Sequence, residues 1–275
     1  LEENVSIIFK NKVLILGREN KRVIFKGIKE STKWGSISIE GDESFVNYSD
    51  FYGGFGDILN NKFYTSMLSV RNSKNVTLQN ITLIQKNETN IPNYYDDLLH
   101  VIYSKNLKII NAKFLNSLGD ALDIDVSEAE ILNSFFENSG NDSIDFMSSN
   151  ASVENVKITN SGDKGISIGE NSKINITDST INRSFIGIES KDSSVVEVHK
   201  SSFFNNNIRR PHFTYLFCCR QYVGLASHLK SLLIVDSDDV CLRHHIHQFV
   251  PSSLNPKVHS IENDCRVLRV DLTDH

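Results

Sequence analysis

The stretch NSLGDALDID, residues 116–125, recurs in altered form as NSGNDSIDF from Asn138, NSGDKGISI from Asn160 and NRSFIGIES from Asn182. Its leading asparagines are 22 residues apart, and a fixed period in the low twenties is typical of a solenoid in which each repeat forms one coil. Within each repeat, apolar and polar residues alternate, as in the closing LDID of the first stretch. Alternation with a period of two is typical of β-strands and not of helices. One strand per coil, stacked on the next, predicts a parallel β-helix.

The same apolar pairs continue toward the N-terminus at longer spacing. Leu99 precedes Leu122 by 23 residues, whereas Leu68 precedes Leu99 by 31 residues and Ile37 precedes Leu68 by 31. The extra length before Leu99 falls in the polar run KNETNIPNYYDD. Proline, asparagine and acidic residues favour an excursion from the coil over another strand. We therefore expect an all-β chain of about 22-residue coils with insertions near its N-terminal end.

A second column of polar residues supports the same register. It follows apolar residues coil by coil and consists of Asn80, Asn111, Asn133, Asn155 and Asp178. A side-chain amide at a bend can donate to the amide of one neighbouring coil and accept from the other. We interpret this column as a buried turn ladder with a structural role.

These repeats resemble the right-handed parallel β-helix proteins of the pectin lyase-like superfamily. WGSISIEG at residues 34–41 resembles the first full coil of bacterial surface members, and GDKGISIGENS at residues 162–172 resembles their later coils. The resemblance implies a right-handed, single-stranded β-helix. It also implies one of several functions, because the superfamily includes lyases, hydrolases, epimerases, phage tailspikes and adhesins.

The chain divides into three parts by composition. Residues 1–30 hold three short β-branched runs and are expected to form an irregular first coil and N-terminal cap. Residues 31–207 form the predicted β-helix. Residues 208–275 hold all four cysteines and seven of the nine histidines. This tail is interpreted either as frameshifted or fused sequence or as a native C-terminal cap.

The composition narrows the range of partners. No run of 18 apolar residues occurs, which argues against a membrane span. The net charge is −5 and the basic residues are scattered, so nucleic acid is not expected as a partner. The first residue is Leu, so either a signal peptide has been removed or the chain is a fragment. We expect an extracellular or cell-surface protein with a polysaccharide or cell-surface glycan as partner, and the oligomeric state is not indicated.

The predicted register stacks one outward-facing residue per coil on the strand that carries the apolar pairs. This outward column reads Ser38, Ser69, His100, Asp123, Asp145, Ser167, Glu189. Stacked carboxylates about 4.8 Å apart repel, so one of them should resist ionisation. We therefore predict catalytic roles for His100, Asp123 and Asp145. Substrate-binding roles are predicted for neighbouring outward and turn residues, namely Asp97, Asp120, Asp125, Asp142, Lys164 and Glu189.

The expected function is binding, and in one alternative processing, of polysaccharide along this acidic strand face. A second alternative is a structural or adhesive repeat protein without a ligand, and a third is a polysaccharide lyase or glycoside hydrolase. The chain lacks the motif sets of polygalacturonases and alginate epimerases, which weakens the enzymatic alternatives. No metal ligands are assigned and no cofactor is firmly implied, although Ca²⁺ is a candidate at the acidic column.

Overall fold

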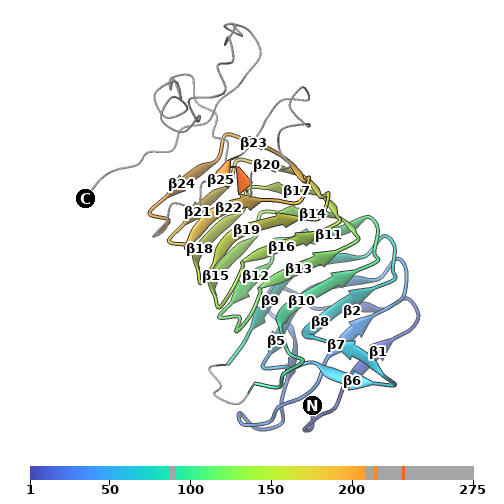
Figure 1. Ribbon diagram of the computed structural model, residues 1–275. Helices are drawn as coiled ribbons and strands as arrows, with labels where there is room; N and C mark the ends of the chain where they lie inside the picture. Colours follow the sequence, from blue (N-terminus) through green and yellow to red (C-terminus); the bar gives the residue numbers. More distant parts are fainter. Residues whose placement is uncertain (87–90, 208–213, 216–230, 233–275) are drawn as a thin grey trace, which may run out of the picture.

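The structure is a computed structural model that describes residues 1–86 and 91–207, together with the backbone of β25 (Thr214–Tyr215) and β26 (Ser231–Leu232). Over the described residues the chain has strands and turns but no helix. The strands wind into stacked coils that form a parallel β-helix (Figure 1). The fold class predicted from the 22-residue period is therefore confirmed.

One face of the β-helix is an eight-stranded parallel sheet, here called sheet A. Each coil contributes the strand that carries the outward column. The strands are, in order, β1 (Ile7–Phe9), β4 (Ile37–Ile39), β8 (Ser66–Arg71), β10 (Asp97–Ile102), β13 (Leu122–Asp125), β16 (Ile144–Met147), β19 (Lys164–Gly169) and β22 (Ile186–Ser190).

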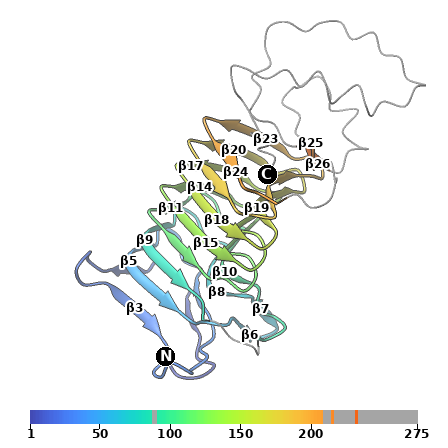
Figure 2. The same cartoon turned by 90° about the vertical axis from the view of Figure 1, so that its left-hand side faces the viewer.

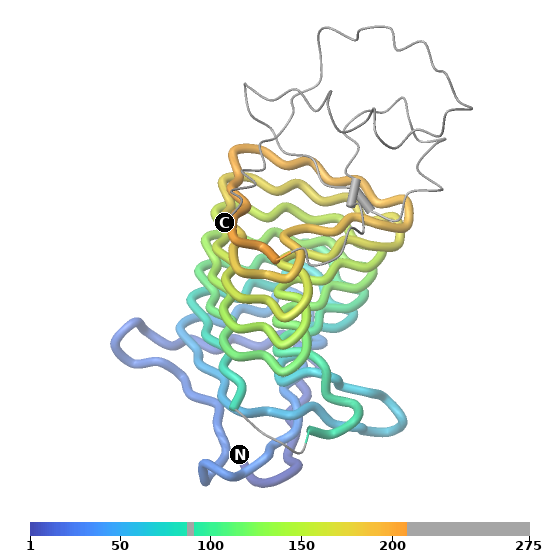
Figure 3. The backbone as a smooth tube through the Cα atoms, turned by 60° about the vertical axis from the view of Figure 1, so that its left-hand side comes forward, coloured from blue at the N-terminus to red at the C-terminus, as the bar shows by residue number. Residues whose placement is uncertain are grey.

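The remaining two faces belong to a single fourteen-stranded sheet, here called sheet B. Its two stacks merge because the long strands β5 (Phe45–Tyr52) and β9 (Thr77–Ile84) take part in both: β9 pairs with β11 and also with β12. One stack contains β2 (Leu14–Leu16), β11 (Leu107–Ile110), β14 (Glu128–Leu132), β17 (Asn150–Glu154), β20 (Lys173–Thr177) and β23 (Val195–His199). The other contains β3 (Val23–Lys26), β12 (Lys113–Leu115), β15 (Phe135–Ser139), β18 (Lys157–Ser161), β21 (Thr180–Asn182) and β24 (Ser202–Phe204). Figures 2 and 3 follow these coils from the blue to the orange end.

The core runs the length of the coils as a continuous apolar column. The predicted inward pairs are fully buried, as Leu122, Ile124 and Phe146 show with no exposed surface. Side chains at equivalent positions stack on one another, and the rings of Phe114 and Phe136 lie 4.5 Å apart and 1° from parallel. The alternation of strand residues therefore sorts side chains into a dry interior and an outer face.

The asparagine ladder connects coils as expected, but it is not buried. Asn111 donates to Asn80 at 3.1 Å and Asn155 donates to Asn133 at 2.7 Å, and Asn111, Asn133 and Asn155 are exposed to solvent. The prediction of a buried ladder was wrong. The backbone at these turns is left-handed, with φ near 51° at Asn133, and asparagine is among the residues that adopt this conformation most readily.

The buried ladder among the described residues is made of serines, which were not predicted from the sequence to have this role. Each serine hydroxyl accepts a hydrogen bond from the backbone N–H of a serine in the neighbouring coil, at 2.9–3.3 Å along the series Ser73, Ser104, Ser127, Ser149, Ser172, Ser194. Because these turns enter the core, their N–H groups have no access to water and need an internal acceptor.

An antiparallel hairpin interrupts the N-terminal coils. It consists of β6 (Asp57–Leu59) and β7 (Lys62–Tyr64), and it projects from the coil stack beside β8 (Figures 1 and 2). Its turn residues Asn60 and Asn61 both have positive φ, which is typical of the tight turn that matches strand twist. The hairpin contacts the coil stack at Glu40, which accepts hydrogen bonds from Lys62 Nζ at 3.0 Å and from Tyr64 Oη at 2.9 Å.

The structure describes the N-terminal 30 residues in full, but only two short strands of residues 208–275. β1 pairs with β4, and β2 and β3 pair with β5, all in parallel, so the first 30 residues contribute strands to the same sheets. Their role as a cap stays a prediction. The cysteines and histidines of residues 208–275 lie outside the described residues, as does the choice between a foreign tail and a native cap. No described helix is long and apolar enough to cross a membrane.

Candidate functional site

The strand register of sheet A brings the predicted outward column together. His100 pairs with Asp123, Asp123 with Asp145, Asp145 with Ser167, and Ser167 with Glu189. Ser38 and Ser69 continue the column below His100. The sequence therefore placed all these side chains correctly relative to one another.

The expectation that this column is open to solvent along its length was wrong. Ser38 and Ser69 have no exposed surface and His100 is 8% exposed. The β6–β7 hairpin contacts Glu40, and Arg71 Nη1 donates to the carbonyl of Phe63 in the same hairpin, at 2.7 Å. Because Glu40 and Arg71 flank the two serines in sequence, the hairpin covers this part of sheet A. Further along the column, Asp123, Asp145 and Glu189 are half-buried, so a ligand has access to them, whereas Ser167 is buried.

His100 is held by contacts on both ring nitrogens. Its Nε2 lies 3.1 Å from Asp125 Oδ2 and 3.6 Å from Asp123 Oδ2. Its Nδ1 lies 3.2 Å from the hydroxyl oxygen of Thr65. The threonine comes from the segment between β7 and β8, so two distant parts of the chain orient the ring.

Asp97 is the most constrained carboxylate of the site. It begins β10, has no exposed surface, and its Oδ1 has no hydrogen-bond partner. Its Oδ2 accepts from Thr65 at 3.5 Å. Burial, followed by repulsion from Asp123 and Asp96, raises the pKa of Asp97 well above its usual range. A buried carboxylate with an unused oxygen is costly to ionise unless a cation or proton is supplied.

Asp123 and Asp145 are in register on adjacent coils and half-buried. Burial, followed by the charges of Asp125 and Asp145, raises the pKa of Asp123 to about 9. The expectation that one carboxyl of the stack resists ionisation agrees with this direction. Asp125, the next outward-facing residue of the same strand, contacts the site through His100 Nε2.

Asp120 and Asp142 form a turn ladder beside the column. Asp120 Oδ1 accepts from the backbone N–H of Asp142 and from Asn141 Nδ2, both at 2.8 Å. Asp142 Oδ1 accepts from the backbone N–H of Lys164 at 2.7 Å. Burial raises the pKa of Asp120 to about 7 and that of Asp142 to about 6, the latter against the opposing charge of Lys164. These bonds give both aspartates a structural role in the turns.

Lys164 closes the acidic region at its far end. Its Nζ lies 2.5 Å from Asp163, 3.7 Å from Asp142 and 3.7 Å from Glu189. Burial alone would lower the pKa of Lys164, but the bond to Asp163 and the neighbouring carboxylates raise it. The lysine therefore stays charged and neutralises part of the site.

An open pocket of about 480 Å³ adjoins the column. It is lined by Ile58, Phe63, Thr65, Asn93, Tyr94, Tyr95 and Asp96. Phe63, on the hairpin, is 55% exposed. Thr65 belongs both to this pocket and to the His100 contacts, so the two are contiguous. The loop that supplies the tyrosines is tied down where the backbone N–H of Asp96 donates to Thr65 O at 2.8 Å.

Phe63 and Thr65 are site residues that were not predicted from the sequence. A signal for the hairpin was present in Asn60-Asn61 between the short runs DIL and KFY, a pattern typical of a two-residue hairpin turn. The direction in which the hairpin folds back was not encoded in that signal.

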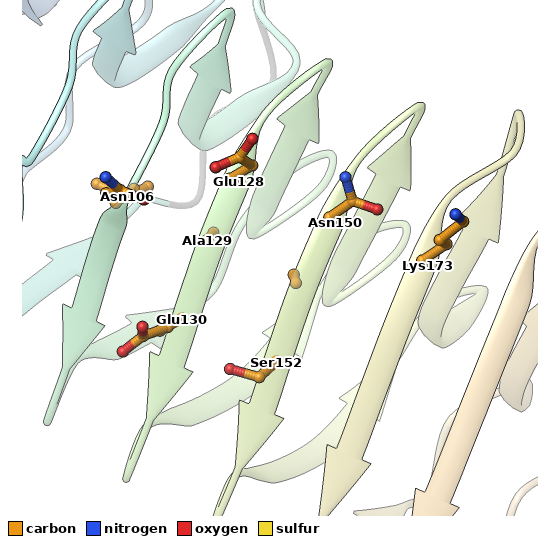
Figure 4. A pocket seen from close by; sticks show the side chains of 9 residues that line it. Asn106, Glu128, Ala129, Glu130, Asn150, Ser152 and Lys173 are labelled. Atoms are coloured by element: carbon orange, nitrogen blue, oxygen red, sulfur yellow. The ribbon is translucent and has the colours of Figure 1, made fainter.

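A second hollow lies on the outer face of sheet B and has different chemistry (Figure 4). Its volume is about 400 Å³, and Asn106, Glu128, Asn150 and Lys173 follow one another along the four adjacent strand starts. Opposite charges are paired across this face, as between Lys108 and Glu130 at 3.0 Å. No described aromatic residue lines it, so sheet A offers the stronger candidate site.

Comparisons with known proteins agree with this architecture. The family model described as "Right handed beta helix region" matches residues 35–230. No curated protein sequence matches the chain.

Several solved structures are similar in fold. An alginate lyase from Paenibacillus sp. str. FPU-7 has a TM-score of 0.44 and 10% identity, over 75% of this chain and 90% of the lyase. The catalytic domain of a GH87 α-1,3-glucanase has a TM-score of 0.44 and 11% identity, over 73% of this chain and 40% of that chain. PfbA, a surface adhesin of Streptococcus pneumoniae, has a TM-score of 0.20 and 12% identity, over 75% of this chain and 80% of the adhesin. At these identities the likeness concerns the fold alone.

Proposed function

This chain belongs to the right-handed β-helix family, and we propose that it binds a polysaccharide along the outer face of sheet A. The ligand would start at the aromatic pocket beside Phe63 and extend over Asp123 and Asp145 toward Lys164. With such a ligand we expect the protein to act outside the cell or at its surface.

The observation that carries this proposal is the continuity of the aromatic pocket with a row of hydrogen-bonding side chains. Phe63 and Tyr94 offer ring faces on which a sugar ring can stack. Thr65 and Asp96 line the same pocket and supply hydroxyl and carboxylate groups that match sugar hydroxyls. A volume of about 480 Å³ lies within the range of small-ligand pockets, and apolar walls with a few convergent polar groups are typical of them.

The row is long enough for more than one sugar unit. From His100 to Glu189 the register crosses five successive strands of sheet A. At about 4.8 Å per strand this distance is roughly 19 Å. An extended oligosaccharide therefore fits along the column, with one end in the aromatic pocket.

The charge of the face favours a neutral glycan over a polyanionic one. Seven aspartates lie in or beside the column, namely Asp96, Asp97, Asp120, Asp123, Asp125, Asp142 and Asp145, and Lys164, 3.7 Å from Asp142, is the lysine among the described residues that contacts this set. Burial raises the pKa of Asp97 and Asp123, so these two add little negative charge near neutral pH. A polyuronate brought against this face would be repelled unless a cation bridged the two.

Affinity electrophoresis against a panel of neutral and acidic polysaccharides tests the proposal. Replacement of exposed Phe63 by alanine should weaken binding by about five- to a hundredfold, because a stacked aromatic contributes about 1–3 kcal/mol to ring binding. Phe204→Ala removes an aromatic that is 43% exposed at the other end of the molecule and serves as the matched control. Failure of every glycan to bind the folded protein would favour a structural or adhesive repeat protein without a ligand.

Cleavage of the bound glycan is a second candidate, favoured by the in-register carboxyls of Asp123 and Asp145. A spacing of about 5 Å between carboxyls matches retaining glycosidases. Release of reducing ends, abolished in Asp145→Asn, would establish it. Unchanged release in that variant would exclude this pair of residues.

A further inference from the structure

Three side chains of sheet A form a cluster with the composition of a metal site. One carboxylate oxygen of Asp97, one ring nitrogen of His100 and one carboxylate oxygen of Asp123 all lie within 4.8 Å of one another. They come from the adjacent strands β10 and β13, whose register is set by backbone pairing. Their relative position therefore follows from the rigid core of the β-helix and not from a mobile loop.

Asp97 provides a second, independent observation that points to a ligand at this cluster. The side chain is completely buried, yet its Oδ1 has no hydrogen-bond partner. Most buried polar atoms in folded proteins have a partner, so an exception calls for an ion, a water or a function. The carboxylate also belongs to the cluster of ligand atoms, which makes a cation the partner best suited to its charge.

We propose that Asp97, His100 and Asp123 bind a divalent transition-metal ion. The donor set is one imidazole nitrogen and two carboxylate oxygens. Imidazole suits zinc, iron, nickel and copper, whereas Ca²⁺ takes six to eight oxygens and disfavours nitrogen. A transition metal therefore fits these three ligands better than the Ca²⁺ expected from the acidic column alone.

The distance between two of the three ligands is already close to that of coordination. Ligands about 2.0–2.2 Å from a tetrahedral ion are about 3.3–3.6 Å from one another, and His100 Nε2 lies 3.6 Å from Asp123 Oδ2. Thr65 contacts the other ring nitrogen at 3.2 Å. A partner on the second nitrogen orients a coordinating histidine and selects its tautomer. Asp125, 3.1 Å from Nε2, would release the ring on metal binding or join as a fourth ligand.

Metal binding does not require a glycan, but it affects how a glycan would bind and react. Coordination would hold Asp123 as an anionic ligand, so it could not also serve in the two-carboxyl cleavage considered above. Three protein ligands leave a coordination position open toward the half-buried face. A sugar hydroxyl or carboxylate could occupy it, which would make glycan binding stronger in the presence of the metal.

Metal binding is measured with the full chain and with Mn²⁺, because the cysteines of residues 208–275 would compete strongly for Zn²⁺. Protein freed of metal with a chelator is titrated by calorimetry, and free Mn²⁺ is followed by electron paramagnetic resonance. The wild type should bind Mn²⁺ at a site that is weakened by at least about tenfold in His100→Gln and in Asp97→Asn. Asp142→Asn, which removes a buried carboxylate outside the cluster, should bind Mn²⁺ as the wild type does.

Three results would overturn the proposal. The first is no difference in Mn²⁺ binding between the wild type and His100→Gln, with both folded by circular dichroism. The second is tighter binding of Ca²⁺ than of Mn²⁺ with no effect of His100→Gln, which would indicate an all-oxygen calcium site. The third is equal loss of binding in Asp142→Asn, which would indicate general attraction by the acidic face. Glycan binding is measured separately with chelator present, so a failed metal titration does not decide the proposed function.

Discussion

The asparagine ladders and the acidic column stack like side chains in the same way, but with opposite electrostatic results. Asn138 donates to Asn116 and accepts from Asn160, at 3.0 and 2.8 Å. Each amide is both donor and acceptor, so repetition satisfies it. Carboxylates only accept, so repetition at Asp123 and Asp145 produces repulsion. The same coil geometry therefore makes one column structural and leaves the other in need of a proton, a cation or a ligand.

The largest effect is expected from Asp120, where a buried carboxylate can be neutralised without loss of its bonds. Its pKa in the folded state is about 7, above the ordinary 3.8, so the folded state holds the proton more tightly between these values. Stability contributed by the protonated form is complete below about pH 4 and is lost as pH rises through about 7. The wild type should therefore lose up to about 4 kcal/mol of its free energy of unfolding between about pH 4 and pH 7, at about 1.4 kcal/mol per pKa unit. Asp120→Asn, which cannot ionise, should not show this loss.

Chemical denaturation at several pH values between 4 and 8 measures this change. Asp178→Asn, at an exposed turn, should leave the pH profile unaltered. If the free energy of unfolding changes with pH in the same way in the wild type and in Asp120→Asn, burial of this carboxyl does not control the pH dependence of stability.

The serine ladder should be more sensitive than the exposed asparagines because its donors are buried. Ser149 Oγ accepts from the N–H of Ser127 at 3.0 Å and donates to the Ile124 carbonyl at 2.9 Å. Ser149→Ala leaves that buried N–H without an acceptor and should lower the free energy of unfolding by about 2–3 kcal/mol. Ser152→Ala, on the outer face of β17, the strand that follows Ser149, should cost less than about 0.5 kcal/mol. Equal losses of stability in Ser149→Ala and Ser152→Ala would show that the buried serine hydrogen bonds are not more important than exposed serines.

Asn138 separates the backbone contribution of a ladder from its amide contribution. Its φ is 59°, so alanine would lose two amide bonds and also strain the left-handed turn. Asn138→Ala should cost about 1–2 kcal/mol, and Asn138→Gly should cost less because glycine adopts this conformation freely. Thermal or urea unfolding of both variants gives the two contributions. A larger cost for glycine than for alanine would show that backbone handedness does not select asparagine here.

The smallest effect is expected on the outer face of sheet B. The side chains of Lys108 and Glu130 are 47% and 49% exposed and lie 3.0 Å apart. Lys108→Ala should change the free energy of unfolding by less than about 1 kcal/mol, and this change should disappear at high salt because salt screens the ion pair. A salt-insensitive loss would instead indicate packing by the lysine stem.

Much of the candidate site was predictable because the repeat is local in sequence. Alternation placed Leu122 and Ile124 inside and Asp123 outside, and the 22-residue period aligned Asp123 with Asp145. Burial was not predictable in the same way. His100 and Asp97 were expected on an open face, yet both are buried and both contact Thr65 of the preceding coil.

The period and alternation of the sequence by themselves determined the coil, the strand faces and the register, because each depends on residues within one or two repeats. Only the tertiary structure decided which members of the outward column meet solvent. The hairpin that carries Phe63 folds back against sheet A, and the length of an insertion does not specify its direction. Thr65, directly after the hairpin, contacts His100, and Asp97 is fully buried. Desolvation and proximity then set the charge state and the ligand preference of the site.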